Sequence, residues 1–255
     1  MNTGLYISTA GLKAQETRQA VIANNIANAK TTGFKRDLMV MQSRLNASME
    51  DPKMFPYRLP VMQNQGGGVY AVGSGIDLTQ SNFETSGSAT DVALNGPGFF
   101  TLAGENGQKL LTRDGRFVMD QDGGLVTAVG KHPVLDNTGK PIVLNIKVPV
   151  DISPDGQITQ GADDQGVKLG LSDVADSRHL LKLGGNVMAV DKPEAISAAS
   201  ADTRVLQYQL EASGVDPMVE IVNMMEGQRA FDANARMITY QDQTLSQLNT
   251  IGRVA

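Results

Sequence analysis

The sequence contains no cysteine and no tryptophan, and only 5% of its 255 residues are aromatic. The absence of cysteine excludes disulfide bonds, thiolate nucleophiles and the cysteine-based zinc and iron–sulfur sites. Because His132 and His179 are the only histidines, a histidine-rich metal site is excluded as well. The cysteine and histidine side chains that many enzyme mechanisms and metal sites require are therefore absent or too few, and we expect no cofactor.

The sequence also lacks a net positive charge and long apolar runs. The net charge of -5 argues against a general attraction to nucleic acid or anionic membranes. No run of about 18 apolar residues occurs, so no transmembrane helix is predicted. The first residues lack a basic region and become polar by Lys13, which predicts no cleaved signal peptide. With 41% hydrophobic residues and 27 glycines, the chain is expected to fold into a loop-rich structure.

Helical patterns occupy both ends of the chain. A seven-residue repeat predicts a helix from residue 3 to about residue 29, and its members are Leu5, Leu12, Gln19 and Ile26. A longer helix is predicted from Asp216-Pro217 to about Asn249. Its apolar repeat consists of Met224, Phe231, Ile238 and Leu245, beside a second column of Ile221, Gln228, Ala235 and Asp242.

The two terminal helices are expected to pair. A C-terminal helix of this length would span roughly 50 Å at 1.5 Å per residue, and its apolar stripe needs a partner. Residues 1–50 carry six basic and three acidic side chains, whereas residues 201–255 carry four basic and seven acidic ones. Opposite charge together with matching repeats favours a paired stem, although exposed ion pairs add only tenths of a kcal/mol each.

The middle of the chain predicts β structure. Turn sequences such as Asn95-Gly96-Pro97-Gly98 and Asp122-Gly123-Gly124 recur about every ten residues, which is typical of a meander or barrel. The strand-like runs between them are residues 99–102, 109–112, 116–119, 125–127 and 142–144. We therefore predict an α+β fold in which long N- and C-terminal helices pair as a coiled-coil stem that carries an inserted all-β, meander- or barrel-like domain. The predicted parts are the stem at 1–38 and 201–255, an irregular connector at 39–75 and the β-rich domain at 76–200.

Several patterns that imitate functional sites are explained by turns. Residues 151–156 resemble the first half of a calcium-binding loop, but Ala162 stands where the bidentate glutamate is required, which favours a hairpin turn. Asp114 and Asp120 could form the carboxylate pair of a hydrolase acting on cell-wall glycan, yet acids beside glycine are common turn formers. Neither histidine has the partners of a catalytic triad. No catalytic, cofactor-binding or metal-binding residue is predicted.

Residues 23–35, Ala-Asn-Asn-Ile-Ala-Asn-Ala-Lys-Thr-Thr-Gly-Phe-Lys, resemble the N-terminal signature of the bacterial flagellar rod, hook and hook-associated axial proteins. Residues 94–100 and 112–117 resemble motifs of the rod and hook branch, and residues 210–217 and 228–234 complete the match near the C-terminus. The resemblance therefore covers nearly the whole chain. It departs from the usual form at Ser213-Gly214-Val215, where Ser-Asn-Val is expected, but asparagine and glycine both tolerate a left-handed backbone.

The resemblance implies a non-enzymatic structural subunit of the flagellar basal-body rod. Such subunits polymerise helically into the axle that crosses the periplasm and transmits torque from motor to hook for swimming. The implied partners are copies of the same chain, other rod and hook proteins and, during secretion without a cleaved signal peptide, the flagellar export apparatus. Neither nucleic acid nor membrane insertion is expected. The resemblance fits both the distal and the proximal rod members, and the sequence of residues 130–135 resembles the proximal member slightly more.

An assembly interface is predicted from the repeats and the signature together. Its residues are Leu5, Leu12, Ile22, Ile26, Asn24, Asn25, Asn28, Gly33, Phe34, Met224, Phe231, Ile238 and Leu245. The signature asparagines are expected to bond the backbone near a helix end or to reach another subunit. The alternative function is a binding module, in which a β domain on a helical stem recognises carbohydrate or a surface partner.

Overall fold

The computed structural model describes residues 3–43, 68–161, 166–200 and 202–252. They form an α+β structure that divides into two compact units. The helical unit comprises Met1–Ala27, Asp37–Gly75 and Pro217–Ala255, and the body comprises Asn28–Arg36 and Ile76–Asp216. The signature is therefore divided between the units: residues 23–27 end the first helix, and residues 28–35 belong to the body.

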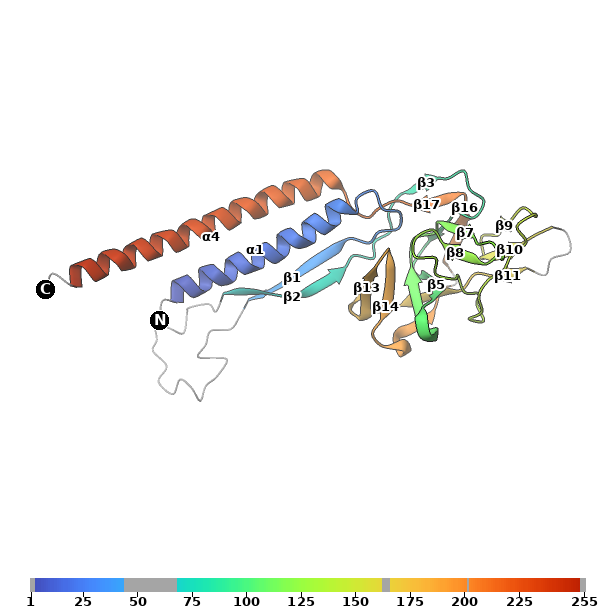
Figure 1. Cartoon of the computed structure of the whole chain (residues 1–255), viewed down its shortest axis with the longest axis horizontal. Helices are drawn as coiled ribbons and strands as arrows, with labels where there is room; N and C mark the ends of the chain where they lie inside the picture. Colours follow the sequence, from blue (N-terminus) through green and yellow to red (C-terminus); the bar gives the residue numbers. More distant parts are fainter. Residues whose placement is uncertain (1–2, 44–67, 162–165, 201, 253–255) are drawn as a thin grey trace. The chain divides into compact units, whose positions relative to one another are not determined.

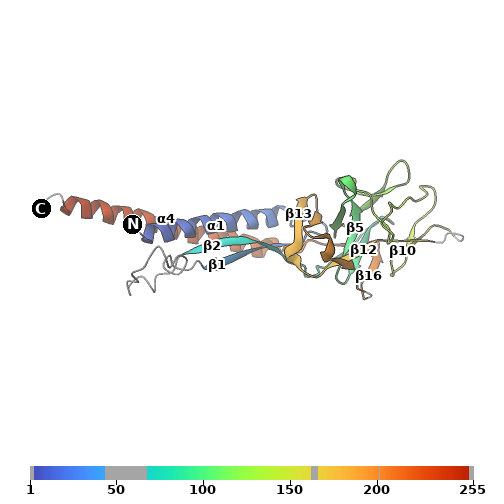
Figure 2. The same ribbon diagram turned by 90° about the horizontal axis from the view of Figure 1, so that it is seen from below.

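The helical unit contains two long helices and a two-stranded ribbon. Helices α1 (Thr3–Ala27) and α4 (Pro217–Gly252) contact one another side by side, which confirms the two predicted helices to within a few residues (Figure 1). Strands β1 (Asp37–Ser43) and β2 (Val69–Ile76) pair, and β1 packs along α1 (Figure 2). Neither helix is long and apolar enough to cross a membrane in the described part of the chain.

Three α4 positions that meet α1 lie between members of the predicted apolar column. The side chain of Gln241 contacts Gly4, and that of Asn234 contacts Gly11, while Gly227 lies against Gln15 and Gln19. These three α4 positions are spaced by seven residues and lie one residue before the second predicted column, of which Ile221, Gln228 and Asp242 are exposed. Glycine allows the helices to approach closely, and amide side chains lie beside each of these glycines.

The predicted connector at 39–75 is not wholly irregular. The apolar run around Val40 forms β1, and residues from Val69 onward form β2, because β-branched side chains favour extended pairing. The connector's middle, residues 44–67, lies outside the described residues. At the other end, the segment from 201 opens with strands of the body before α4 begins, so the predicted stem boundary differs from the observed one.

The body is built on an open, six-stranded sheet. The strand order is β13-β14-β6-β5-β12-β15 and its pairings are antiparallel. These strands are β5 (Phe99–Ala103), β6 (Lys109–Thr112), β12 (Leu171–Val174), β13 (Leu180–Gly184), β14 (Val187–Val190) and β15 (Ile196–Ala198). The sheet has two free ends, and no closed barrel is formed by the described residues, so the barrel-like form of the prediction is wrong.

Smaller sheets surround this one. Pairs are formed by β3 (Phe83–Thr85) with β17 (Gln209–Glu211), β4 (Val92–Asn95) with β16 (Arg204–Gln207), and β7 (Phe117–Met119) with β8 (Leu125–Thr127). A three-stranded sheet contains β9 (Asp151–Ile152), β10 (Gln157–Thr159) and β11 (Val167–Lys168). Three 3-10 turns complete the described elements at Glu105–Gly107, Ser177–His179 and Pro193–Ala195. Four of the five strand-like runs are thus confirmed, whereas residues 142–144 make only an isolated bridge.

Two apolar clusters lie on opposite faces of the six-stranded sheet. Phe100 and Leu110 belong to the larger cluster, while their neighbours Phe99 and Leu111 belong to the smaller one. This alternation follows from the two-residue period of a β-strand. Phe100 packs edge-on against Phe117 of β7 with ring centroids 5.1 Å apart, which ties the small β7–β8 sheet to the large one.

Candidate functional site: a buried junction of the sequence motifs

Three segments that are distant in the sequence meet inside the body. The amide of Gly33 donates to the carbonyl of Glu211 (2.7 Å), and the amide of Gly214 donates to the carbonyl of Phe34 (2.8 Å). The amide of Asp77 donates to the carbonyl of Arg36 (2.9 Å). The segment after α1 is therefore bonded both to the segment after β2 and to the segment before α4.

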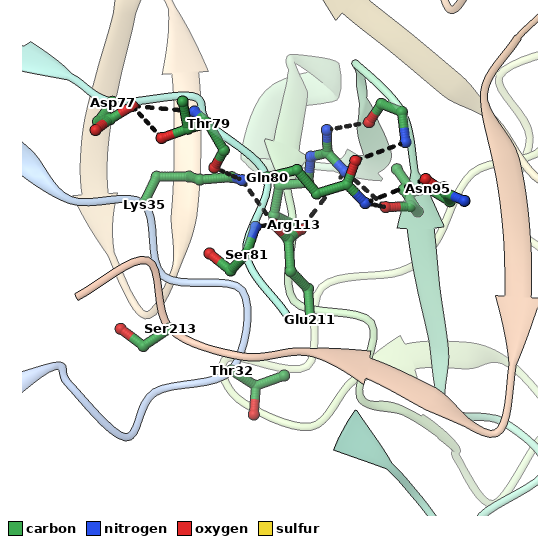
Figure 3. Close-up of polar contacts among 12 residues, drawn as sticks. Thr32, Lys35, Asp77, Thr79, Gln80, Ser81, Asn95, Arg113, Glu211 and Ser213 are labelled. Atoms are coloured by element: carbon green, nitrogen blue, oxygen red, sulfur yellow. Dashed lines mark hydrogen bonds and ion pairs between the residues drawn. The ribbon is translucent and has the colours of Figure 1, made fainter. Parts of the chain in front are cut away.

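A buried cluster of three charged side chains holds this junction together (Figure 3). The Nζ of Lys35 lies 2.7 Å from Oε1 of Glu211, and Nη1 of Arg113 lies 3.5 Å from Oε2 of the same carboxylate. The three side chains are 1%, 1% and 3% exposed for Lys35, Glu211 and Arg113. A charge buried this fully is tolerated only when it is paired and hydrogen-bonded, and the Glu211 carboxylate pairs with both cations.

Backbone groups complete the cluster's hydrogen bonds. Lys35 also donates to the carbonyl of Thr79 (2.8 Å), and the amide of Ser81 donates to Oε1 of Glu211 (3.0 Å). Arg113 donates to the carbonyls of Leu94 (3.2 Å) and Gly96 (2.6 Å). The 94–100 motif is therefore joined to the cluster through its main chain, while the other motifs contribute side chains.

Burial dominates the electrostatics of the cluster. It lowers the pKa of Lys35 below its ordinary 10.5, although the nearby Glu211 carboxylate opposes this shift. Burial likewise lowers the pKa of Arg113, again against the attraction of Glu211. The Nε of Arg113 has no hydrogen-bond partner among the described atoms, so the guanidinium is not fully satisfied. The site stabilises a joint and offers no exposed nucleophile or acid.

The end of the signature packs tightly against this joint. Gly33 has a φ of 66°, and a Cβ there would lie 2.5 Å from the carbonyl carbon and oxygen of Arg113. The buried Phe34 ring faces the Nζ of Lys182, which lies 4.0 Å from the ring centroid. The side chain of Asn186 donates to the carbonyl of Thr32. Gly33 and Phe34, both predicted for the assembly interface, are thus internal residues of the body.

The predicted signature asparagines occupy three different environments. Asn25 is 1% exposed and exchanges two hydrogen bonds of 3.0 Å with the backbone of Asp37, which fixes the chain reversal after α1. Asn24 is exposed. The carbonyl of Asn28 accepts from Ser213 Oγ (2.9 Å), and its side chain accepts from Thr31. Bonding of backbone near a helix end is therefore confirmed for Asn25.

The predicted helical seam residues are only partly covered. Ile22 is buried, and Leu12, Ile26, Met224 and Ile238 are half-buried. Phe231 is 36% and Leu245 is 39% exposed, and the side chain of Leu5 lies outside the described part. The structure brings Ile22 and Asn25 into the core of the helical unit and leaves the larger α4 side chains partly open.

The acidic turns have structural roles. Both oxygens of Asp114 accept from Arg116, at 3.0 Å from Nε and 2.6 Å from Nη2, and the backbone amide of Arg116 bonds the same carboxylate. Residues 151–159 form the predicted hairpin, with Ile152 paired to Ile158 and Gly156 at a φ of 84°. The described residues contain no group of three or more acids or histidines placed to hold a metal ion.

The junction is the part of the site that sequence reasoning missed. Lys35, Arg113 and Glu211 each stand inside a motif that was noticed, but each looks like an ordinary surface charge when read alone. Their immediate sequence neighbours do not mark them as buried, because Arg113 lies beside Asp114 and Lys35 lies beside Arg36.

Comparison with known families matches three stretches of the chain. Residues 5–35 match the family described as "Flagella basal body rod protein", residues 93–160 match "Flagellar hook protein FlgE/F/G D1 domain", and residues 206–251 match "Flagellar basal body rod FlgEFG protein C-terminal". Lys35, Arg113 and Glu211 fall one in each stretch. The cluster therefore links all three family segments.

Full-length relatives carry the same names. The chain is 35% identical to the flagellar basal-body rod protein FlgG of Buchnera aphidicola from Acyrthosiphon pisum, over 98% of this chain and 100% of the relative. It is 34% identical to FlgF of Caulobacter vibrioides over 93% of both chains, and 29% identical to FlgG of Bacillus subtilis over 99% and 100%. With α1, the body and α4 all matched in order, the chain belongs to the flagellar basal-body rod protein family.

Proposed function

We propose that this chain is a structural subunit of the flagellar basal-body rod, which polymerises helically with its own copies and with other rod and hook proteins. Family membership and full-length similarity to FlgG and FlgF support this role. The rod would span the periplasm and transmit torque from motor to hook. We further propose that the chain is exported through the flagellar apparatus without a cleaved signal peptide.

The observation that carries the proposal is the apolar surface of α4. Seven of its large apolar side chains are 43–71% exposed, and they are Met218, Val219, Ile221, Val222, Met225, Met237 and Tyr240. A helix in a monomeric protein rarely leaves so many apolar side chains uncovered. Packing against neighbouring subunits would bury them, and a heterologous contact of this kind generates a helical filament.

We propose that α1 and α4 form the stem of the assembled subunit. Their contacts at Gly4, Gly11 and Gly227 support close pairing, and Met224, Phe231 and Ile238 follow one heptad column on α4. We also propose that the protein is not an enzyme. The bonding of Asp114 within its own turn supports this, because both of its carboxylate oxygens already accept hydrogen bonds from Arg116.

Deletion of the gene followed by imaging of basal bodies tests the proposal. Missing or short rods, without hooks and without swimming, are expected, and the chain supplied in trans should restore them. The length of the remaining rod distinguishes a proximal from a distal subunit. Intact basal bodies in motile cells would contradict a rod role and favour the binding-module alternative.

A further inference from the structure

The buried cluster contains two cations and one anion, which makes Glu211 different from its two partners. Its carboxylate is the nearest negative charge to both Lys35 and Arg113, with Asp77 and Asp173 acting on them from farther away. Two like charges buried side by side without a counter-ion are strongly destabilising. Removal of Glu211 therefore leaves a different state from removal of either cation.

The order of these residues along the chain adds a second observation. Both cations precede the anion, and Glu211 stands just before α4, in the segment that also bonds Gly33 through its carbonyl oxygen. Ser213, two residues later, bonds the carbonyl of Asn28, where the signature enters the body. The short segment from Glu211 to Ser213 therefore supplies both the counter-charge of the cluster and the groups that hydrogen-bond the backbone of the signature.

We propose that Glu211 is the closing residue of the body: Lys35 and Arg113 are buried only together with its counter-charge, so the body completes its folding only when the segment before α4 has docked. This makes folding of the central sheet depend on both ends of the chain. The inference concerns the folding of the single chain and holds whether or not the chain is a rod subunit.

Charge balance predicts an unusual order of variant stabilities. Glu211→Gln leaves two buried cations without their counter-ion. Lys35→Met leaves the Arg113–Glu211 ion pair, which has no net charge. We expect the urea midpoint to fall at least about twice as far in Glu211→Gln as in Lys35→Met. The second substitution should also rescue the first, so that Lys35→Met/Glu211→Gln is more stable than Glu211→Gln alone.

Equilibrium unfolding of the full chain tests this order, with Glu84→Gln as the matched control. Glu84 is an exposed acid on β3, and its partner across the ladder is Leu210, next to Glu211. The control should leave the midpoint unchanged. If Glu211→Gln yields no folded protein, recovery of folded protein in the double variant gives the same result. A double variant less stable than Glu211→Gln would show that the side chains act by packing, and would overturn the proposal.

The order of closure is tested by refolding the full chain with pulsed hydrogen exchange. We expect the β5–β6 amides to become protected in the same kinetic phase as Gly33 and Gly214, and Glu211→Gln to slow that phase. Protection of β5–β6 in an earlier phase, with Glu211→Gln delaying only Gly33 and Gly214, would show that the body closes without Glu211.

Discussion

Gly33 and Arg113 touch through their main chains, so closely that a Cβ on Gly33 would lie 2.5 Å from the carbonyl oxygen of Arg113. This contact presses the signature against the motif that carries Arg113. It also means that the signature glycine has two separate requirements, a left-handed backbone at a φ of 66° and the absence of a side chain.

Gly33→Ala is therefore predicted to destabilise the body more than an ordinary left-handed glycine would. Gly107→Ala is the matched control, because Gly107 has a φ of 77° and nothing near its Cβ position. The control should cost about 1–2 kcal/mol from backbone strain alone, and Gly33→Ala should cost clearly more because a backbone carbonyl must move. Urea unfolding of the two variants measures the difference. An equal loss of unfolding free energy in the two variants would mean that the contact between Gly33 and Arg113 does not affect stability.

Local patterns in the sequence predicted part of the secondary structure. Seven-residue repeats located both helices, and turn residues such as Asp122-Gly123 helped to locate β5, β6, β7 and β8, because these signals involve neighbours along the chain. The repeats assigned no contact to Gly227 of α4, although it lies against α1. Its role depends on Gln15 and Gln19 across the seam, which a repeat within α4 does not reveal.

The buried cluster could not be predicted for a related reason. Lys35, Arg113 and Glu211 are far apart in the sequence, and nothing local distinguishes a buried lysine from a surface one. Their partners include the carbonyls of Thr79 and Leu94, which any residue possesses. Only the paths of three chain segments through the body determine that these groups meet.

The stability of the body is predicted to rise with pH at the alkaline end. The pKa of Lys35 is lowered in the folded state, mainly by burial and despite Glu211, while Arg113 lowers and Asp77 raises it more weakly. Between that lowered pKa and the ordinary 10.5, the unfolded chain binds more protons than the folded one, so stability increases with pH. The stability difference between wild type and Lys35→Met should shift in favour of wild type as pH rises toward 10.5. A difference that stays constant over this range would contradict the lowered pKa of Lys35 in the folded state.

Asn25→Ala is predicted to destabilise the helical unit by about 1–3 kcal/mol, because the buried Asn25 side chain makes two hydrogen bonds to the backbone of Asp37 that the variant lacks. Asn24→Ala is the control at the exposed neighbouring position and should have a smaller effect. Thermal unfolding followed by the helical signal compares the two. If both variants unfold alike, the asparagines of the signature act outside the single chain, for example at another subunit.

Phe231→Asp is predicted to block assembly while leaving the body folded. The ring is 36% exposed in the single chain, so a carboxylate there costs little before assembly but would be buried against a neighbour in a packed rod. Ala233→Asp introduces the same charge at an exposed position two residues later, about 200° around the helix. Rods should be absent from cells that carry Phe231→Asp, and proteolysis of the purified chain should release an intact body. Normal rods in those cells would mean that the Met224–Phe231–Ile238 column is not an assembly seam, and rods lost equally with Ala233→Asp would show that any added charge on α4 prevents packing.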